Sequence, residues 1–248
     1  MAADDPPSET TGDDQTVREG EFLSTVAHEL KTPVAVITGL ADTLSERRHS
    51  LTEEQIDHCL NRISRQGDRL ARLVGDLVDL SQVESGRLRV RLEPVNVAAV
   101  VERALDDAQP PREKSVELNV PEALWAVADA RRLEQVLVNL LTNAYSHGGS
   151  TIRLDARGER RPAGTATRFE GVVVVTVADD GDGVPTELIQ TVFERFGRGP
   201  DADGEGSGLG LAIAQTLVDG FGGRIWYEHG EPTGAQFKFF LMRAVQPV

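Results

Sequence analysis

A histidine and a glutamate stand side by side at His28 and Glu29, just ahead of Pro33. Within a predicted helix, His28 lies about 200° around the axis from Val26 and Leu30, so it should point away from the buried stripe. Pro33 crowds the carbonyl of Glu29, which costs a helix interior about 3 kcal/mol. An exposed imidazole beside a carboxylate, next to a weakened turn, indicates a chemical site. The alternative is a surface histidine, with Pro33 as the first residue of a new helix.

Two amide side chains, Asn139 and Asn143, form a second candidate group. They are four residues apart in a predicted helix and therefore share a face. Amide oxygens are hard, neutral ligands that suit Mg²⁺, which keeps water and phosphate ligands of its own. Taken alone, the pair is better explained as two amides on a helix surface.

An acidic, glycine-rich turn at 179–185 follows a predicted buried strand. Asp179 could accept a hydrogen bond from the exocyclic amine of a base, while Gly181 and Gly183 let the backbone approach the ring. The alternatives are a plain turn or a calcium loop. An EF-hand loop needs a glutamate at its twelfth position and flanking helices, and neither fits here.

Three glycines at alternate positions, Gly206, Gly208 and Gly210, lead into another predicted helix. Such glycines can turn backbone N–H groups toward phosphate oxygens at a helix start. The segment lacks the Gly-Lys-Ser/Thr of a P-loop, and it does not follow the first strand of a Rossmann unit. It therefore indicates a nucleotide fold of another type.

The segment from Phe193 to Arg198 precedes this glycine run. Arg195 or Arg198 could bring positive charge to a transferring phosphate. The following residues, 199–205, are acidic and glycine-rich, which is typical of a mobile lid but also of an ordinary loop.

Two long helices are expected to position the histidine. The first runs over 17–46, residues 47–50 form a turn, and Ser50 or Thr52 caps the second helix, which ends near 85–86. The second helix has apolar residues every seven positions, at Ile56, Ile63, Leu70 and Leu77, which is bundle periodicity. Two such helices make a poor fold alone, so we expect a homodimeric four-helix bundle; the alternative is a hairpin that packs on the second domain.

The pattern changes from residue 88 onward, where helices and strands intermix. Strands are predicted at 88–92, 115–120, 125–128, 151–157 and 171–178, with a hairpin over 224–242 that turns near 230–234. Helices are predicted at 97–107, 130–145 and 210–220. This mixture indicates an α/β or α+β second domain.

Composition excludes several classes of protein. The formal net charge of −14 argues against binding nucleic acid through its phosphates. The single cysteine, Cys59, permits no disulfide within the chain and is expected in the core. No apolar run approaches the ~20 residues that span a bilayer. Residues 1–16 are acidic and polar and are expected to be disordered.

Together and in this order, the motifs resemble those of the sensor histidine kinases of two-component signalling. The phosphoacceptor box is matched at 28–33, the asparagine box at 139–144, the first glycine box at 179–183, the phenylalanine box at 193–198 and the second glycine box at 206–210. The resemblance covers about residues 17–242.

This resemblance implies an α+β fold, in which a helical hairpin forms a dimeric four-helix bundle and an α/β-sandwich (Bergerat-type) ATP-binding domain follows. The implied domains are a disordered acidic tail at 1–16, the dimerisation and histidine-phosphotransfer hairpin at 17–86 and the catalytic ATP-binding domain at 87–248.

The resemblance also implies residue roles. His28 would be the phosphoacceptor, Glu29 the general base, and Thr32 the residue that holds a phosphatase water. Asn143 would bind Mg²⁺, and Asp179 would bind the adenine amine.

The remaining ATP contacts implied by the family are Asn139, Gly181, Gly183, Phe193, Arg195, Arg198, Gly206, Gly208 and Gly210. Three positions depart from the usual family pattern. Ser146 stands where lysine is frequent, Asp180 where asparagine is common, and Asp182 where proline is frequent.

The function implied is ATP-dependent autophosphorylation on His28, followed by transfer to an aspartate of a response regulator receiver domain, in the cytoplasm. No sensor domain is visible, so we expect either the catalytic part of a membrane receptor or a soluble kinase with a sensor partner. Other interpretations are an ATP-driven machine such as a chaperone or mismatch-repair clamp, a catalytically dead dimeric scaffold, and a serine kinase of the anti-sigma type.

Overall fold

The computed structural model describes residues 11–84, 90–160, 171–195 and 208–246. The chain folds as two compact units, divided between Gly75 and Asp76. The first unit contains α1 (Thr11–Arg47), a 3-10 turn (Arg48–Ser50) and most of α2 (Glu53–Glu84). The helical hairpin is as expected, although α1 begins at Thr11, ahead of the expected start at residue 17, within the segment expected to be disordered. The interpretation of Pro33 as the start of a new helix is wrong, because α1 runs through it.

A reciprocal pair of hydrogen bonds starts α2. Thr52 Oγ1 accepts from the backbone N–H of Gln55 at 3.2 Å, and Gln55 Oε1 accepts from the N–H of Thr52 at 3.0 Å. This capping box satisfies two backbone donors that no helical carbonyl can reach. Of the two caps considered from the sequence, Thr52 is the one used; the Ser50 hydroxyl instead donates to the carbonyl of Arg47.

The hairpin buries part of its apolar surface and leaves part exposed. Pro33 on α1 and Cys59 and Leu73 on α2 are buried, which confirms the core position expected for the cysteine. In contrast, Leu60 and Val74 on α2 are each about half exposed, at 51% and 48%. They lie within about 40° of one another around the helix axis, so α2 presents an apolar strip that α1 does not cover.

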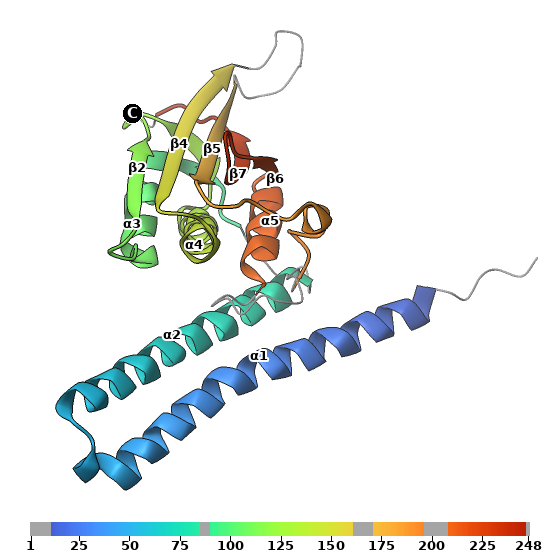
Figure 1. Cartoon of the computed structure of the whole chain (residues 1–248). Coiled ribbons are helices and arrows are strands. Elements are labelled where there is room, and N and C mark those ends of the chain that lie inside the picture. The colour runs from blue at the N-terminus through green and yellow to red at the C-terminus, as the bar shows by residue number, and fades with distance from the viewer. Residues whose placement is uncertain (1–10, 85–89, 161–170, 196–207, 247–248) are drawn as a thin grey trace, which may run out of the picture. The chain divides into compact units, whose positions relative to one another are not determined.

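The second unit is built on a five-stranded sheet of order β2-β4-β5-β7-β6 (Figure 1). Its strands are β2 (Ser115–Asn119), β4 (Thr151–Arg160), β5 (Gly171–Asp179), β6 (Arg224–His229) and β7 (Ala235–Met242). β2 and β4 are parallel, and the other pairs are antiparallel. The helices α3 (Val97–Ala108), α4 (Ala130–His147) and α5 (Gly210–Gly220) lie side by side over the sheet.

A separate two-stranded sheet pairs β1 (Glu93–Asn96) with β3 (Trp125–Ala128). The strand expected at 88–92 is therefore corrected: of those residues the structure describes 90–92, which form no strand. The alternation of apolar residues there gave no sign of the pairing with β3. Pro94 is tolerated because β1 has a neighbouring strand on one side.

The apolar core lies between α4 and the sheet. The helix buries one face, formed by Leu133, Val136, Leu137, Leu140, Leu141 and Ala144.

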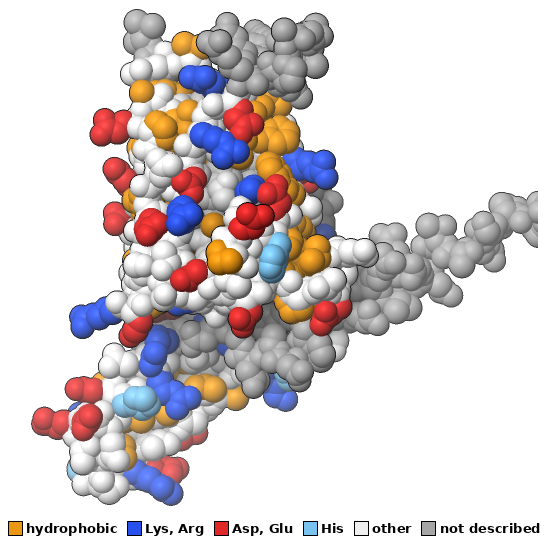
Figure 2. All heavy atoms as spheres, turned by 45° about the horizontal axis from the view of Figure 1, so that its top comes forward, with side chains coloured by type: hydrophobic (Ala, Val, Ile, Leu, Met, Phe, Trp, Pro, Cys, Tyr) orange, Lys and Arg blue, Asp and Glu red, His pale blue; other side chains and the backbone are white. Residues whose placement is uncertain are grey.

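On the face of the molecule in Figure 2, acidic side chains are interspersed with basic ones. Among the described residues, no helix has the length and apolar character needed to cross a membrane.

Candidate functional site

The His28 side chain is exposed on α1, as its helical position predicted. One turn later, Thr32 Oγ1 donates a hydrogen bond to the carbonyl of His28 at 3.2 Å. Its hydroxyl is therefore held against the same turn of backbone that carries the imidazole. Pro33 follows directly and has no N–H to offer the carbonyl of Glu29.

The carboxylate of Glu29 turns toward α2. Its Oε2 lies 3.1 Å from Nη2 of Arg69, and each side chain is 18% exposed. Arg69 Nε is buried and has no hydrogen-bond partner among the residues that the structure describes. The sequence alone does not indicate Arg69 as a site residue, because nothing in its local pattern shows that it contacts a residue 40 positions earlier.

In the second unit, the candidate nucleotide-site residues lie along α4 and near its C-terminal end. Asp129 caps its start by accepting from the N–H groups of Arg131 and Arg132. Asn139 Nδ2 donates to the carbonyl of Gly210 at 3.0 Å, which ties α4 to the first residue of α5. Nine residues further, Gly148 ends the helix, about 14 Å along the axis.

Asp179 lies at that far end. A Cβ placed on Gly148 would come within 2.5 Å of the Cβ of Asp179, so only glycine fits there. Asp179 Oδ1 accepts from the N–H of Gly181 at 2.9 Å and from that of Ala235 at 3.3 Å. In the described part of the chain, Oδ2 has no hydrogen-bond partner. A carboxylate held in this way by backbone amides can offer its second oxygen to a ligand amine.

The adjacent Asp180 binds the start of β4 through both of its carboxylate oxygens. Its Oδ1 accepts from the N–H of Thr151 at 2.8 Å, and its Oδ2 lies 3.3 Å from the hydroxyl of Ser150. The hydrogen bond from Thr151 lowers the pKa of the Asp180 carboxyl below its ordinary value. Asp180 therefore fixes the start of β4 beside the site.

Lys114 closes the same turn from the other side. Its Nζ donates to the carbonyls of Gly148 and Gly149 at 2.8 and 2.9 Å. Nothing in the sequence around Gly148 indicates Lys114, which lies 34 residues earlier. The turn that carries Gly148 is thus clamped between Lys114 and Asp180.

The glycines of the acidic turn are required by the protein itself. Gly183 has a φ of +78°, and a Cβ there would lie 2.8 Å from the carbonyl oxygen of Gly234. A Cβ on Gly181 would lie 2.9 Å from the nitrogen of Gly149. Close packing within the protein thus gives both glycines a structural reason, as in the plain-turn alternative, and their approach to a base stays a prediction.

The start of α5 follows a glycine in the left-handed region of backbone conformation. Gly208 has a φ of +68°, a backbone conformation that favours glycine, and no side chain of the described residues caps the helix. Asn143 is half-buried on α4, and the described residues offer its amide no hydrogen-bond partner. The first amides of α5 and the oxygen of Asn143 suit phosphates and a hydrated cation.

A metal held by protein side chains alone does not fit. Among the described residues there is no group of three or more histidine, cysteine, aspartate or glutamate side chains that could hold a metal. Mg²⁺ fits as an ion that shares its ligands between Asn143 and the phosphates of a nucleotide, which is its usual manner of binding.

Phe193 rests on the sheet. Its ring lies 6.0 Å from that of Phe237 on β7, edge to face. Arg195 is exposed. Two of the residues predicted for the site, Arg198 and Gly206, lie outside the described residues.

Both halves of the chain match known protein families. A model of the His Kinase A (phospho-acceptor) domain matches residues 18–86. A model of the histidine kinase-, DNA gyrase B- and HSP90-like ATPases matches residues 128–245. The two ranges contain the exposed histidine and the α4–α5 site, respectively.

Curated relatives carry both halves within longer chains. The probable sensor histidine kinase TcrY of Mycobacterium tuberculosis is 35% identical over 182 residues, which cover 72% of this chain and 36% of that protein. The signal transduction histidine-protein kinase AfsQ2 of Streptomyces coelicolor is 29% identical over 244 residues, covering 91% of this chain and 42% of that protein. This chain thus spans less than half the length of each.

Solved structures share the fold. The histidine kinase AdeS of Acinetobacter baumannii is 26% identical, with a TM-score of 0.59 and coverage of 87% of this chain and 97% of that one. Full-length ShkA in complex with AMPPNP is 28% identical, also with a TM-score of 0.59, and covers 92% of this chain and 47% of that one.

Proposed function

The chain belongs to the sensor histidine kinases of two-component signalling, and from this premise we propose that it transfers the γ-phosphoryl group of ATP to His28 and then to an aspartate of a receiver domain. The observation that carries the proposal is the exposed imidazole of His28 on α1, within the matched phospho-acceptor range, in a chain that also builds an ATPase-type site around α4. Because ATP and receiver domains are cytoplasmic, we propose that the reaction takes place there.

ATP would lie along α4 in the second unit. Asp179 Oδ2 would accept from the adenine amine, because Oδ1 is already bonded to two backbone N–H groups. The phosphates would lie at the other end, near Gly208, Gly210 and the first amides of α5. Bound there with Asn143, Mg²⁺ would neutralise part of the phosphate charge.

In the transfer step, a nitrogen lone pair of the neutral His28 ring attacks the γ-phosphorus. The bond from the γ-phosphorus to the bridging oxygen breaks, and ADP leaves with the bonding electrons. Positive charge develops on the ring, and Glu29 accepts the hydrogen of the other ring nitrogen. Arg69 holds the Glu29 carboxylate between α1 and α2, where each of the two side chains is 18% exposed. Positioning and charge neutralisation supply most of the catalysis in such transfers.

The exposed strip on α2 supports a homodimer. Leu60 and Val74 are half exposed on one face of the helix, which the hairpin itself does not cover. A second copy of the hairpin would cover this strip and complete a four-helix bundle.

Thr32 supports a second reaction at the same turn. Its hydroxyl is one turn from His28, where it could hold a water for attack on the phosphoaspartate of the regulator. We propose that the protein can also dephosphorylate its receiver domain.

The test is labelling with ATP that carries a radioactive γ-phosphate, comparing wild type with His28→Gln. We expect acid-labile label on the wild type and none on the variant. His58→Gln, at another exposed histidine on α2, is the matched control and should label normally. Equal labelling of wild type and His28→Gln, or acid-stable label, would contradict the proposal.

A further inference from the structure

The segment that leaves the acidic turn is weakly attached to the fold. Residues 182–194 include one short 3-10 turn, Thr186–Leu188, and no strand. Their hydrogen bonds to one another are local, such as those from Leu188 to Pro185 and from Thr191 to Leu188. Within the described part of the chain, one hydrogen bond joins the segment to the rest of the fold: the N–H of Val184 donates to the hydroxyl of Tyr227 at 3.2 Å.

Tyr227 is held in place from its other side. Its hydroxyl lies 3.2 Å from Nδ1 of His229, two residues further along β6. Because the phenol oxygen accepts from Val184, its own hydrogen can be donated to the imidazole. The ring of His229 also lies against the turn, since a Cβ on Gly183 would come within 3.1 Å of it.

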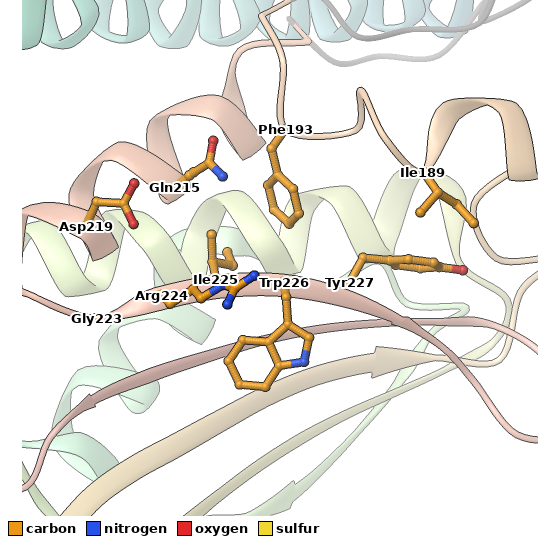
Figure 3. A pocket seen from close by; sticks show the side chains of 9 residues that line it. All are labelled: Ile189, Phe193, Gln215, Asp219, Gly223, Arg224, Ile225, Trp226 and Tyr227. Carbon is orange, nitrogen blue, oxygen red and sulfur yellow. The ribbon is translucent and has the colours of Figure 1, made fainter. Parts of the chain in front are cut away.

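The ring of Tyr227 supports the other end of the segment. It lies 5.6 Å from the ring of Phe237, which in turn contacts Phe193 edge to face. Tyr227, Phe193 and Ile189 line a cavity of about 530 Å³ between the segment, α5 and β6 (Figure 3). The segment therefore borders this cavity. It is held near its start by the hydrogen bond from Val184 to Tyr227, and near its end by the contact of Phe193 with Phe237.

We propose that Tyr227 is a positioning residue for nucleotide binding. Its hydroxyl fixes the chain directly after the turn that presents Asp179, and its ring supports Phe193 through Phe237. Tyr227 acts on the nucleotide site through these residues. This inference rests on the proposed ATP site and adds a residue, far away in sequence, on which the affinity of that site depends.

The test is Tyr227→Phe, which removes one oxygen and keeps the ring. The variant loses both hydrogen bonds of the hydroxyl, to Val184 and to His229. Loss of the Val184 bond, which orders the binding segment, should raise the dissociation constant for Mg-ATP, measured by calorimetry, about three- to tenfold. The KM for ATP in autophosphorylation should rise by the same factor, while kcat at saturating ATP stays within about twofold. Hydrogen exchange at the Val184 amide should become faster.

Trp226→Phe is the matched control. Trp226 is the neighbouring residue on β6, and its Nε1 donates a hydrogen bond to Glu228 at 2.7 Å. Trp226 lines the same cavity, but the hydrogen bond that Trp226→Phe loses joins two residues of β6 and does not involve the segment. The ATP affinity of this variant should therefore match the wild type. Tyr227→Val, which also removes the ring, should lose more affinity than Tyr227→Phe.

Two results would overturn the inference. One is wild-type ATP affinity in Tyr227→Phe; the other is an equal loss in Trp226→Phe, which would indicate a general weakening of the sheet. Failure of the proposed kinase activity is distinguishable, because it would appear as wild-type protein that binds ATP but leaves His28 unlabelled. The binding comparison between variants still decides the role of Tyr227 in that case.

Discussion

At the scale of single residues, the two oxygens of the Asp179 carboxylate differ in their hydrogen bonding. Oδ1 accepts from Gly181 and Ala235, which fixes the plane of the group. Oδ2 has no hydrogen-bond partner among the described residues, and under the proposed function it would accept from the adenine amine. The affinity for adenine should therefore depend on the chemical character of this one atom.

Asp179→Asn tests this dependence with almost no change of shape. The amide oxygen can take the place of Oδ1 and keep both backbone bonds, which puts an NH₂ donor where Oδ2 was. A donor facing the adenine amine cannot bond to it, so we expect ATP affinity to fall about ten- to a hundredfold. Calorimetric titration with a non-hydrolysable ATP analogue measures this.

The exposed Asp182, on the same turn, supplies the control for that experiment. Asp182→Asn removes the same charge and should bind the analogue like wild type. If Asp179→Asn also bound like wild type, the assignment of Asp179 to the adenine amine would be wrong.

At the scale of elements, the carboxylate of Asp180 holds the turn between α4 and β4 in place. Asp180 accepts from the N–H of Thr151 and the hydroxyl of Ser150, and these bonds favour its charged form. The pKa of Asp180 is lowered mainly by the Thr151 bond. Because the folded-state pKa lies below that of the unfolded chain, this carboxylate stabilises the fold above about pH 4 and loses that contribution as the pH falls further.

Asp180→Asn should therefore reduce the fall in the free energy of unfolding that occurs as the pH drops below about 4. The amide oxygen can still accept from Thr151 but does not titrate. We expect the variant to be less stable than wild type at pH 7, and the gap between them to narrow at pH 3. Urea midpoints at the two pH values give the comparison; a gap of constant size would show that Asp180 contributes nothing to the pH dependence.

Periodicity predicted the elements well where a buried face runs along one helix or strand. The helix expected at 97–107 is observed at Val97–Ala108, and the strand expected at 125–128 is β3. The face of α4 that buries Leu137 and Leu140, and leaves Asn139 and Asn143 half exposed, was also predicted. Each of these follows from a pattern within a few residues.

Contacts between distant segments could not be predicted in the same way. Arg69 meets Glu29 across 40 residues, and Tyr227 meets Val184 across 43. Periodicity tells which face of an element is buried but not which residue it faces. The strand predicted at 88–92 was wrong for this reason. The observed strand, β1, is defined by its pairing with β3.

At the scale of the whole molecule, the exposed strip on α2 leads to a prediction about assembly. Val74→Glu places a charge in the middle of the proposed dimer interface, where burial without a partner is costly. We expect sedimentation equilibrium to show a dimer for wild type and a shift to monomer for the variant.

Asn61→Glu is the control for the dimer experiment. Asn61 is exposed on the same helix, and its direction is about 100° from that of Leu60. It adds the same charge outside the strip and should leave the dimer intact. A dimer that tolerated Val74→Glu equally well would have to form through another surface.

The hydrogen bond from Thr32 to the carbonyl of His28 has a consequence for the direction of chemistry at this turn. A hydroxyl has one hydrogen, and here it is already given to the backbone. Only the lone pairs of the oxygen remain, so any water that settles on Thr32 must donate to it. Such a water keeps its own lone pairs turned outward, which is the orientation of an attacking nucleophile. Transfer of a phosphoryl group to the His28 nitrogen and hydrolysis of the regulator's phosphoaspartate would thus use the same helical turn, and the backbone carbonyl of His28 would orient the water through Thr32.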